Sequence, residues 1–300
     1  MSPTTIPDTF SAYVAESFGD AFEEIKLRTD VLKASVGPTQ VRIKIHSAAL
    51  NPADYKIVEM GKGYLPTPTK ENPIRLGLDL AGTLVEVGAD VTKFKVGDEV
   101  VAMAFFGETG SLAEYIVLDI KHLALKPKNV SFNVAAGLPV VGQTSYQALV
   151  TYGKLKKGDR VLILGGSSGC GILGIQIAKA LGAAHVIATT SSRNTELVKS
   201  FGADEVVNYT KENYGDILAA HSIDLIYDCG FEGASYNDAG QKVLKKDTGI
   251  FVTIDPHVKA SDSAIGTSFH AIRTGAGSDD LKTNHARGKI ILQVLPEAAT

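Results

Sequence analysis

The sequence predicts an α/β protein of two domains, in which a β-rich domain is followed by a parallel sheet covered by helices. Three observations support this prediction. The chain has 300 residues, 44% of them hydrophobic, and a single core stops growing at roughly 250–300 residues. Short apolar stretches separated by glycines dominate residues 41–139. Apolar stretches that alternate with helical patterns dominate residues 143–254.

In the first half, the apolar stretches have the length and alternation of β-strands. Residues 41–45 alternate apolar and polar side chains, as a half-buried strand does. Further strands are expected at residues 80–87, 100–104 and 113–117, with glycines between them as turns. We therefore expect a compact β-barrel or sandwich with little helix.

After residue 138 the pattern changes to strands that alternate with helices. Helices are expected at residues 143–152, 172–181 and 194–201. Strands are expected at residues 160–164, 185–188, 205–207, 223–227 and 249–254. Each strand is a short apolar run, which is typical of a parallel sheet covered on both faces. Right-handed crossovers then give a doubly wound sheet of the Rossmann type. Beyond residue 256 the pattern is weak until a strand expected at residues 289–294.

Charge and cysteine content argue against several classes of protein. The 30 Lys and Arg nearly balance the 33 Asp and Glu, so neither nucleic acid nor an anionic membrane is expected as a partner. No apolar run reaches the ~18 residues of a membrane span, and residues 1–16 lack the Lys and Arg of a signal or transit peptide. Two cysteines, Cys170 and Cys229, make no disulfide framework, which fits a reducing cytoplasm.

The strongest local signal is a glycine-rich turn at residues 164–172, which follows an expected strand and opens an expected helix. Small residues let the backbone approach a pyrophosphate, and the helix start offers free N–H groups. The expected cofactor-binding residues here are Gly166, Ser167, Ser168, Gly169, Cys170 and Gly171. Ser168 stands where a glycine is usual, and a plain tight turn is the alternative interpretation.

The next strand end indicates which nucleotide is bound. NAD sites carry an acid about 20 residues further on, to bind the ribose 2′-hydroxyl. Here the chain has Thr190, Ser191, Ser192 and Arg193, with no carboxylate. Hydroxyl groups and a guanidinium suit a 2′-phosphate, so this segment predicts NADPH over NADH. Alternatively the serines cap the next helix, and both roles can coexist.

Several motifs then follow one another in a recognisable order. They lie at residues 49–56, 63–66, 77–88, 97–100, 110–115, 138–146, 164–172, 202–209 and 286–290. In this series the chain resembles the zinc-lacking medium-chain dehydrogenases/reductases, which include quinone oxidoreductases, zeta-crystallins and alkenal/enone reductases. The resemblance covers nearly the whole chain. It implies a GroES-like substrate domain over residues 1–137, a Rossmann domain over 138–256 and a shortened return to the first domain over 257–300.

The resemblance also implies that no zinc is bound. Zinc alcohol dehydrogenases have a cysteine ligand where Asn51 stands and a histidine ligand where Leu78 stands. A structural zinc site needs about four Cys or His ligands at short spacings, and the chain has only two cysteines and scattered histidines. Alcohol oxidation through a zinc alkoxide is therefore not expected.

The reaction implied by the resemblance is hydride transfer from NADPH to a quinone or to the β-carbon of an enone. Charge then builds on the carbonyl oxygen, so a nearby donor helps. Tyr64 is the first candidate donor, and an ordinary packed aromatic is the alternative; Tyr55 is its substitute. Lys56 is a candidate cation near the nicotinamide ribose or the substrate oxygen. Asn51 and Asp54 are expected to shape the cleft, with Asp54 orienting Lys56.

Further cofactor contacts are expected around the sheet. By resemblance, Thr144 lies near the nicotinamide and Tyr209 beside the adenosine phosphate. The remaining candidates end strands at the carboxyl edge of the sheet, where such ligands lie; they are Cys229, Gly230, Thr253 and Ile254.

The chain also departs from the family. Residues 255–287 are short, so a piece that usually completes one wall of the cleft is missing. Three outcomes are open: a wider and more exposed site, compensation by the rest of the chain, or NADPH binding without efficient turnover. The last corresponds to an NADPH-binding structural or regulatory, crystallin-like protein, and an enoyl-thioester reductase is a further alternative. The family commonly dimerises through the last strands of two Rossmann sheets. We expect a homodimer of this kind, with residues 249–254 as the open edge strand.

Overall fold

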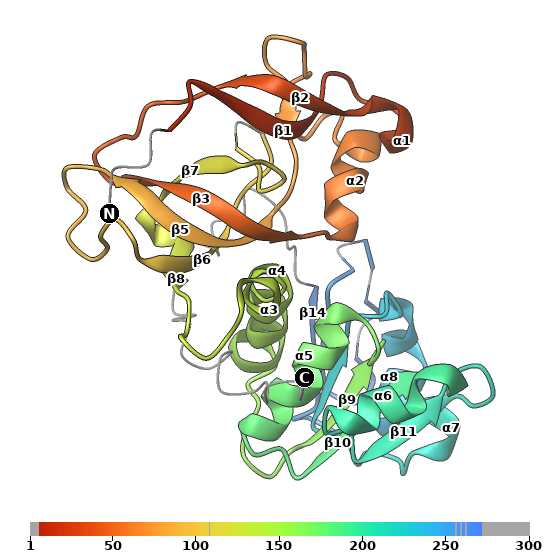
Figure 1. Cartoon of the computed structure of the whole chain (residues 1–300). Helices are drawn as coiled ribbons and strands as arrows, with labels where there is room; N and C mark the ends of the chain where they lie inside the picture. The colour runs from red at the N-terminus through yellow and green to blue at the C-terminus, as the bar shows by residue number, and fades with distance from the viewer. Residues whose placement is uncertain (1–5, 108, 256, 259, 262, 272–300) are drawn as a thin grey trace. The chain divides into compact units, whose positions relative to one another are not determined.

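The computed structural model describes residues 6–107, 109–255, 257–258, 260–261 and 263–271 (Figure 1). The chain forms two compact units, one of residues up to Val140 and one of residues from Val141. The strand predicted at residues 289–294 and most of the shortened C-terminal segment lie outside the described residues.

The first unit is built from antiparallel strands. A five-stranded sheet has the order β7-β3-β5-β6-β8, and its strands are β3 (Gln40–Ala49), β5 (Asp79–Val87), β6 (Glu99–Met103), β7 (Tyr115–Asp119) and β8 (Leu123–Leu125). Its core includes Val41, Ile43, Leu80 and Leu84. The predicted β-rich architecture is confirmed, because each of the strands expected here is present.

The sequence patterns missed two parts of this unit. A three-stranded sheet of order β2-β1-β4 consists of β1 (Thr9–Ala15), β2 (Ile25–Leu32) and β4 (Ile74–Arg75). Three helices, α1 (Ala21–Glu24), α2 (Pro52–Met60) and α3 (Phe132–Ala136), accompany the sheets. The N-terminal strands were missed because exposed polar and charged residues interrupt their apolar pattern, as in β2, which buries only Val31.

The second unit is a six-stranded parallel sheet of order β11-β10-β9-β12-β13-β14. Its strands are β9 (Arg160–Leu164), β10 (His185–Thr190), β11 (Glu205–Asn208), β12 (Leu225–Asp228), β13 (Ile250–Thr253) and β14 (Ser268–Ala271). The strand order runs outward in both directions from β9 and β12, so the predicted doubly wound sheet is confirmed.

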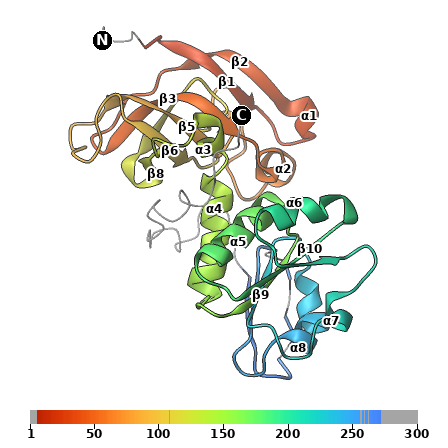
Figure 2. The same ribbon diagram turned by 60° about the horizontal axis from the view of Figure 1, so that its bottom comes forward.

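Helices cover both faces of this sheet. Figure 2 shows α5 (Gly169–Ala180) and α6 (Thr195–Ser200) on one face, with α7 (Tyr214–Ile217) and α8 (Ala239–Val243) on the other. Leu162 and Leu164 belong to the core on the α7 and α8 side, while Ile163 lies close to α5. The apolar side chains of β9 therefore pack on both faces of the sheet, as expected for a buried parallel strand. The unit also contains most of α4 (Pro139–Tyr146), which continues into a π-helix, Gln147–Tyr152.

One strand was predicted in the wrong place in the sheet. The strand at residues 249–254 was expected to be an open edge, but β13 pairs with β12 on one side and with β14 on the other. β14 was missed because Ser-Phe-His-Ala carries one large apolar residue. That residue, Phe269, packs against the rings of Tyr236 and Phe251, with centroids 4.9 and 5.7 Å away.

Candidate cofactor site

The glycine-rich turn joins the carboxyl end of β9 to the start of α5. Gly165 has a φ of +76°, a conformation that glycine adopts without strain. Ser168 is the N-cap of α5, and its Oγ accepts a hydrogen bond from the Gly171 N–H at 3.0 Å. Serine therefore suits this position, where the family pattern usually has glycine, because it satisfies one of the free donors of the helix start.

The turn packs so closely against its neighbours that side chains would not fit. A Cβ on Gly171 would lie 2.3 Å from the Gly165 carbonyl oxygen, and one on Gly166 would lie 2.7 Å from the Ala188 Cβ. A Cβ on Gly165 would lie 2.7 Å from the Gly230 Cα. The turn thus places bare backbone at the N-terminus of a 12-residue helix. These residues fit the pyrophosphate of a dinucleotide, which binds backbone N–H groups at a helix start.

A buried carboxylate holds the neighbouring loop after β12. Asp228 Oδ1 accepts hydrogen bonds from the Gly230 and Glu232 N–H groups, both at 3.0 Å. Asp228 Oδ2 accepts one from the Thr253 hydroxyl at 2.7 Å. Burial raises the pKa of Asp228. The predicted contact residue Thr253 is itself fully buried, so its hydroxyl fixes Asp228.

The other predicted strand-end residues differ in exposure. Cys229 is buried, and its thiol donates to the Leu164 carbonyl oxygen at 3.0 Å. Burial raises the pKa of this thiol. Gly230 is exposed and Ile254 is half-buried, so these two positions remain open to a ligand.

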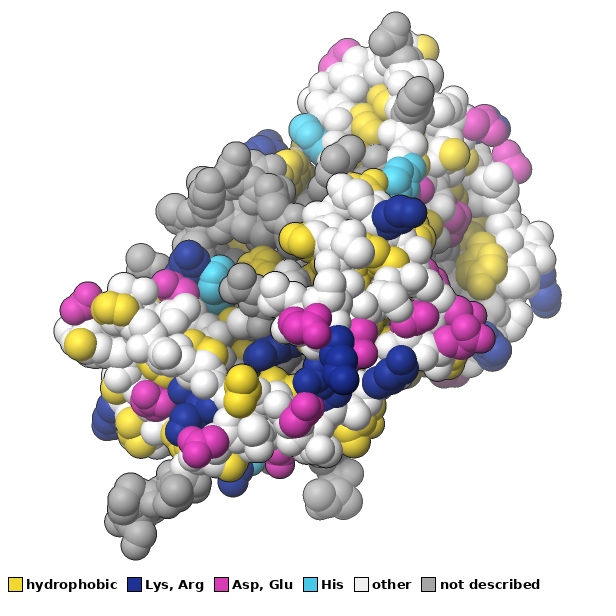
Figure 3. Space-filling view, turned by 90° about the horizontal axis from the view of Figure 1, so that it is seen from above, with side chains coloured by type: hydrophobic (Ala, Val, Ile, Leu, Met, Phe, Trp, Pro, Cys, Tyr) yellow, Lys and Arg dark blue, Asp and Glu magenta, His cyan; other side chains and the backbone are white. Residues whose placement is uncertain are grey.

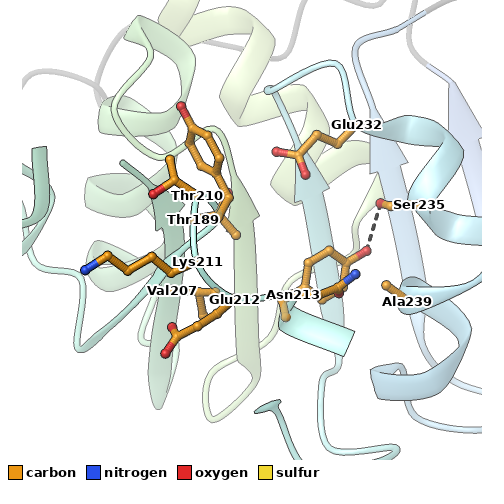
Figure 4. A pocket seen from close by; sticks show the side chains of 11 residues that line it. Thr189, Val207, Thr210, Lys211, Glu212, Asn213, Glu232, Ser235 and Ala239 are labelled. Atoms are coloured by element: carbon orange, nitrogen blue, oxygen red, sulfur yellow. Dashed lines mark hydrogen bonds between the residues drawn. The ribbon is translucent and has the colours of Figure 1, made fainter. Parts of the chain in front are cut away.

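A cavity of about 380 Å³ lies at the same carboxyl edge of the sheet. Figure 4 shows Thr189 and Lys211 on one side of the hollow, with Glu232 and Ser235 on the other. Its lining residues come from β10, β11, α7, α8 and the segments after β11 and β12. The cavity therefore spans the point where the strand order reverses, which is where open α/β sheets bind their ligands. Tyr209, predicted beside the adenosine phosphate, lines this cavity.

The cavity also contains charged residues that the sequence patterns did not single out. They are Lys211, Glu212 and Glu232. Burial is the main cause of a raised pKa for Glu232, and the charge of Asp228 adds to it. The signal that was available is position, since these residues lie four or five residues after the ends of predicted strands.

The segment predicted to bind the 2′-phosphate directly follows β10. Ser192 and Arg193 are exposed, and they lie in a short 3₁₀ helix, Ser192–Asn194. The Asn208 Nδ2 donates to Ser192 Oγ at 2.8 Å, which ties this segment to the end of β11. Within the described part of the chain, Ser191 makes no side-chain capping bond, and Asn194 is the N-cap of α6. Ser191 is thus the N-cap of the short 3₁₀ helix by position, without a capping hydrogen bond from its side chain.

In the first unit, a hydrogen-bonded chain surrounds the start of α2. Asn51 precedes Pro52, which suits the first helical position. The Asn51 N–H donates to Asp54 Oδ2 at 2.6 Å, and Asn51 Nδ2 donates to Asp79 Oδ2 at 2.9 Å. Asp79 Oδ1 accepts from the Val140 N–H at 2.8 Å. Asp79 was not predicted as a site residue; burial is the main cause that raises its pKa to about 7.

The candidate catalytic side chains lie on or after α2. Tyr64 is 78% exposed in the turn that follows this helix, so it is not a packed core aromatic. Lys56 is half-buried on α2, and Tyr55 is 44% exposed. Thr144, in the second unit, is buried within α4. Among the candidate catalytic residues, Tyr64 therefore presents an accessible phenol.

Among the described residues, no group of three or more His, Cys, Asp or Glu could hold a metal ion. No helix in this part of the chain is both long and apolar enough to cross a membrane. On the face shown in Figure 3, basic side chains lie beside acidic ones.

Two family models match the chain. Residues 37–128 match the alcohol dehydrogenase GroES-like domain, and residues 169–267 match the zinc-binding dehydrogenase family. The first match identifies the β-rich unit as the expected GroES-like domain.

Known proteins resemble the chain along most of its length. An NADPH-dependent alkenal/one oxidoreductase of Arabidopsis thaliana chloroplasts is 34% identical over 97% of this chain and 81% of the relative. A 2-methylene-furan-3-one reductase of Solanum lycopersicum is 39% identical over 83% of this chain and 63% of the relative. The chain thus spans less than two thirds of this second relative. The structure of a quinone oxidoreductase from Coxiella burnetii has a TM-score of 0.73 and 29% identity, over 95% of this chain and 88% of that one.

Proposed function

Since this chain belongs to the zinc-lacking medium-chain dehydrogenase/reductase family, we propose that it reduces quinones or α,β-unsaturated carbonyl compounds with NADPH. The observation that carries the proposal is the close-packed turn before α5, which offers bare backbone to a pyrophosphate. The names of the relatives, an alkenal/one oxidoreductase and a quinone oxidoreductase, support the substrate class.

Bound NADPH supplies the hydride from nicotinamide C4, and the protein binds the cofactor and polarises the acceptor. We assign the pyrophosphate to the backbone of Gly166–Gly169 and the start of α5. The Asp228 bonds to Gly230 and Glu232 fix the facing loop. Because these groups are already held by the protein, little ordering is needed when the cofactor binds.

The choice of NADPH over NADH rests on charge and hydrogen bonding at the end of β10. Arg193 is exposed there, and Ser192 Oγ accepts from Asn208, which leaves its hydroxyl proton to donate to a phosphate oxygen. Lys211, on the wall of the adjacent cavity, adds a second cation. A 2′-phosphate carries negative charge, which these side chains would neutralise.

For the acceptor, we assign hydrogen-bond donation to Tyr64. Its hydroxyl is placed in an exposed turn, where it can meet a carbonyl oxygen that gains charge during hydride transfer. Asn51 acts as a positioning residue, since its side chain is bonded to Asp79 and its N–H to Asp54. Lys56 remains a candidate cation near the nicotinamide ribose.

The test is steady-state NADPH oxidation with a benzoquinone, a simple enone and an enoyl thioester. The proposal predicts turnover with the quinone or the enone above turnover with the thioester. Tight NADPH binding without turnover on any of the three would instead identify a crystallin-like binding protein. Turnover on the thioester alone would identify an enoyl-thioester reductase.

We further propose that the protein is a cytoplasmic homodimer. β14 is the outermost described strand on its side of the sheet, so it replaces residues 249–254 as the proposed pairing edge. Both cysteines are free thiols, which suits a reducing compartment. Light scattering in solution tests the assembly, because a dimer has about twice the 31.7 kDa mass of the chain.

A further inference from the structure

Glu232 places a carboxylate in the wall of the cavity at the carboxyl edge of the sheet. Figure 4 shows this side chain on the far side of the hollow from Thr210 and Lys211. The backbone at Glu232 is held in place, because the Glu232 N–H donates a hydrogen bond to Asp228 Oδ1 at 3.0 Å. The side chain thus projects from a loop that the buried Asp228 holds in place.

The carboxylate of Glu232 is half-buried and, within the described part of the chain, accepts no hydrogen bond and forms no ion pair. The nearby charge of Asp228 is of the same sign, and together with burial it raises the pKa of Glu232. A partly desolvated carboxyl group without a partner carries a free-energy cost. A ligand that brings an N–H donor into the cavity would relieve that cost.

The other lining residues favour a flat, polar ring as that ligand. Tyr209 lines the cavity with an aromatic side chain that is 56% exposed, and such a face suits stacking by a planar base. Asn213 also lines the cavity, and its Oδ1 is already used by the Gly215 N–H at 2.8 Å. The cavity lies on the same sheet edge as the turn before α5, within one unit of the chain.

We propose that Glu232 selects the purine base of the cofactor by accepting a hydrogen bond from the exocyclic amino group of adenine. The proposal rests on the proposed function, since it requires NADPH to bind along this edge. Under this proposal Glu232 recognises the adenine base, whereas Ser192 and Arg193 bind the 2′-phosphate. Hypoxanthine has a carbonyl oxygen in place of the amino group, so the carboxyl group would meet an acceptor there.

The experiment compares two reduced cofactors, NADPH and its analogue with hypoxanthine in place of adenine. Dissociation constants are measured by nicotinamide fluorescence on the full-length protein. The wild-type protein should bind NADPH about 10- to 100-fold more tightly than the analogue, as expected for one hydrogen bond to a charged or partly charged group. Steady-state kcat/KM values with both cofactors give a second, kinetic comparison of the two.

Two substitutions at Glu232 test whether its side chain causes the difference in affinity between the two cofactors. In Glu232→Gln the amide can accept from adenine or donate to hypoxanthine, so the ratio should fall to within about 3-fold, chiefly through tighter binding of the analogue. Glu232→Ala should lower the ratio by weakening NADPH binding instead. Both variants keep the backbone N–H that Asp228 holds, and urea unfolding checks that stability is retained.

The matched control is Glu212→Gln, which changes an exposed carboxylate of the same cavity. It should leave the wild-type ratio unchanged. Equal binding of both cofactors by the wild-type protein, or a wild-type ratio in Glu232→Gln, would overturn the assignment while leaving NADPH as the cofactor. Failure of the wild-type protein to bind either cofactor would overturn the proposed function together with this inference.

Discussion

Gly171→Ala tests the claim that the turn before α5 binds the pyrophosphate through bare backbone. The new Cβ would lie 2.3 Å from the Gly165 carbonyl oxygen and 2.7 Å from the Gly166 Cα. Contacts under 3.0 Å are essentially never seen for real Cβ atoms, so the turn must move by about 0.7 Å. This overpacking should cost about 1–3 kcal/mol of stability. Loss of the Ser168 cap on Gly171 would add about 1 kcal/mol.

The larger expected effect is on cofactor binding. A shift of this size misaligns the backbone donors, and the loss of one charge-assisted hydrogen bond is worth about 1.5–3 kcal/mol. The dissociation constant for NADPH should therefore rise at least ~10-fold, as measured by fluorescence titration. Gly174→Ala is the control, since its Cβ would meet side chains and not backbone, with the Tyr227 ring at 3.1 Å and Ile163 Cδ1 at 3.5 Å, and alanine favours the helix. Wild-type NADPH affinity in Gly171→Ala would refute the assignment of the pyrophosphate to this turn.

Three more predictions concern the phosphate, the acceptor and pH. In the double variant Ser192→Ala/Arg193→Ala, the NADPH dissociation constant should rise ~10-fold or more, while NADH affinity stays the same; an equal loss for both cofactors would contradict the phosphate assignment. In Tyr64→Phe, kcat with an enone should fall ~10- to 100-fold at unchanged NADPH affinity, and an unchanged kcat would remove Tyr64 from the mechanism. The pKa of Asp79 is raised to about 7, so folding favours its protonated form. The stability that protonated Asp79 contributes is complete below the ordinary pKa of about 4 and is lost as pH rises through about 7. Urea unfolding should thus show Asp79→Asn losing less stability between pH 5 and pH 8 than the wild-type protein, by on the order of 1–3 kcal/mol; parallel pH profiles would contradict this.

The sheet of the second unit could be predicted because its strands are short apolar runs with the required spacing. β9 was placed at its observed bounds, since all of Val161, Leu162, Ile163 and Leu164 are buried. β14 was missed because its pairing with β13 depends on contacts of Phe269 with residues distant in sequence. Such tertiary contacts leave no periodic signal in four residues.

The parts of the candidate site that depend on local backbone could be predicted from the sequence. The parts that depend on tertiary contacts could not. The glycines of the turn and Ser192 are recognisable from their distance after a strand. The roles of Asp228 and Asp79 were not, because each carboxylate joins segments that only the folded chain brings together. Glu232 likewise becomes a candidate ligand contact only because the folded chain forms a cavity around it.

The most direct test of the central claim is transfer of a labelled hydride. The protein is incubated with a simple enone and with NADPH in which both hydrogens at nicotinamide C4 are deuterium, and the product is analysed by NMR. We expect a saturated ketone with one deuterium at its β-carbon, since the cofactor's hydride is delivered there. A reduced product without deuterium at that carbon, or no reduction of either an enone or a quinone, would contradict it.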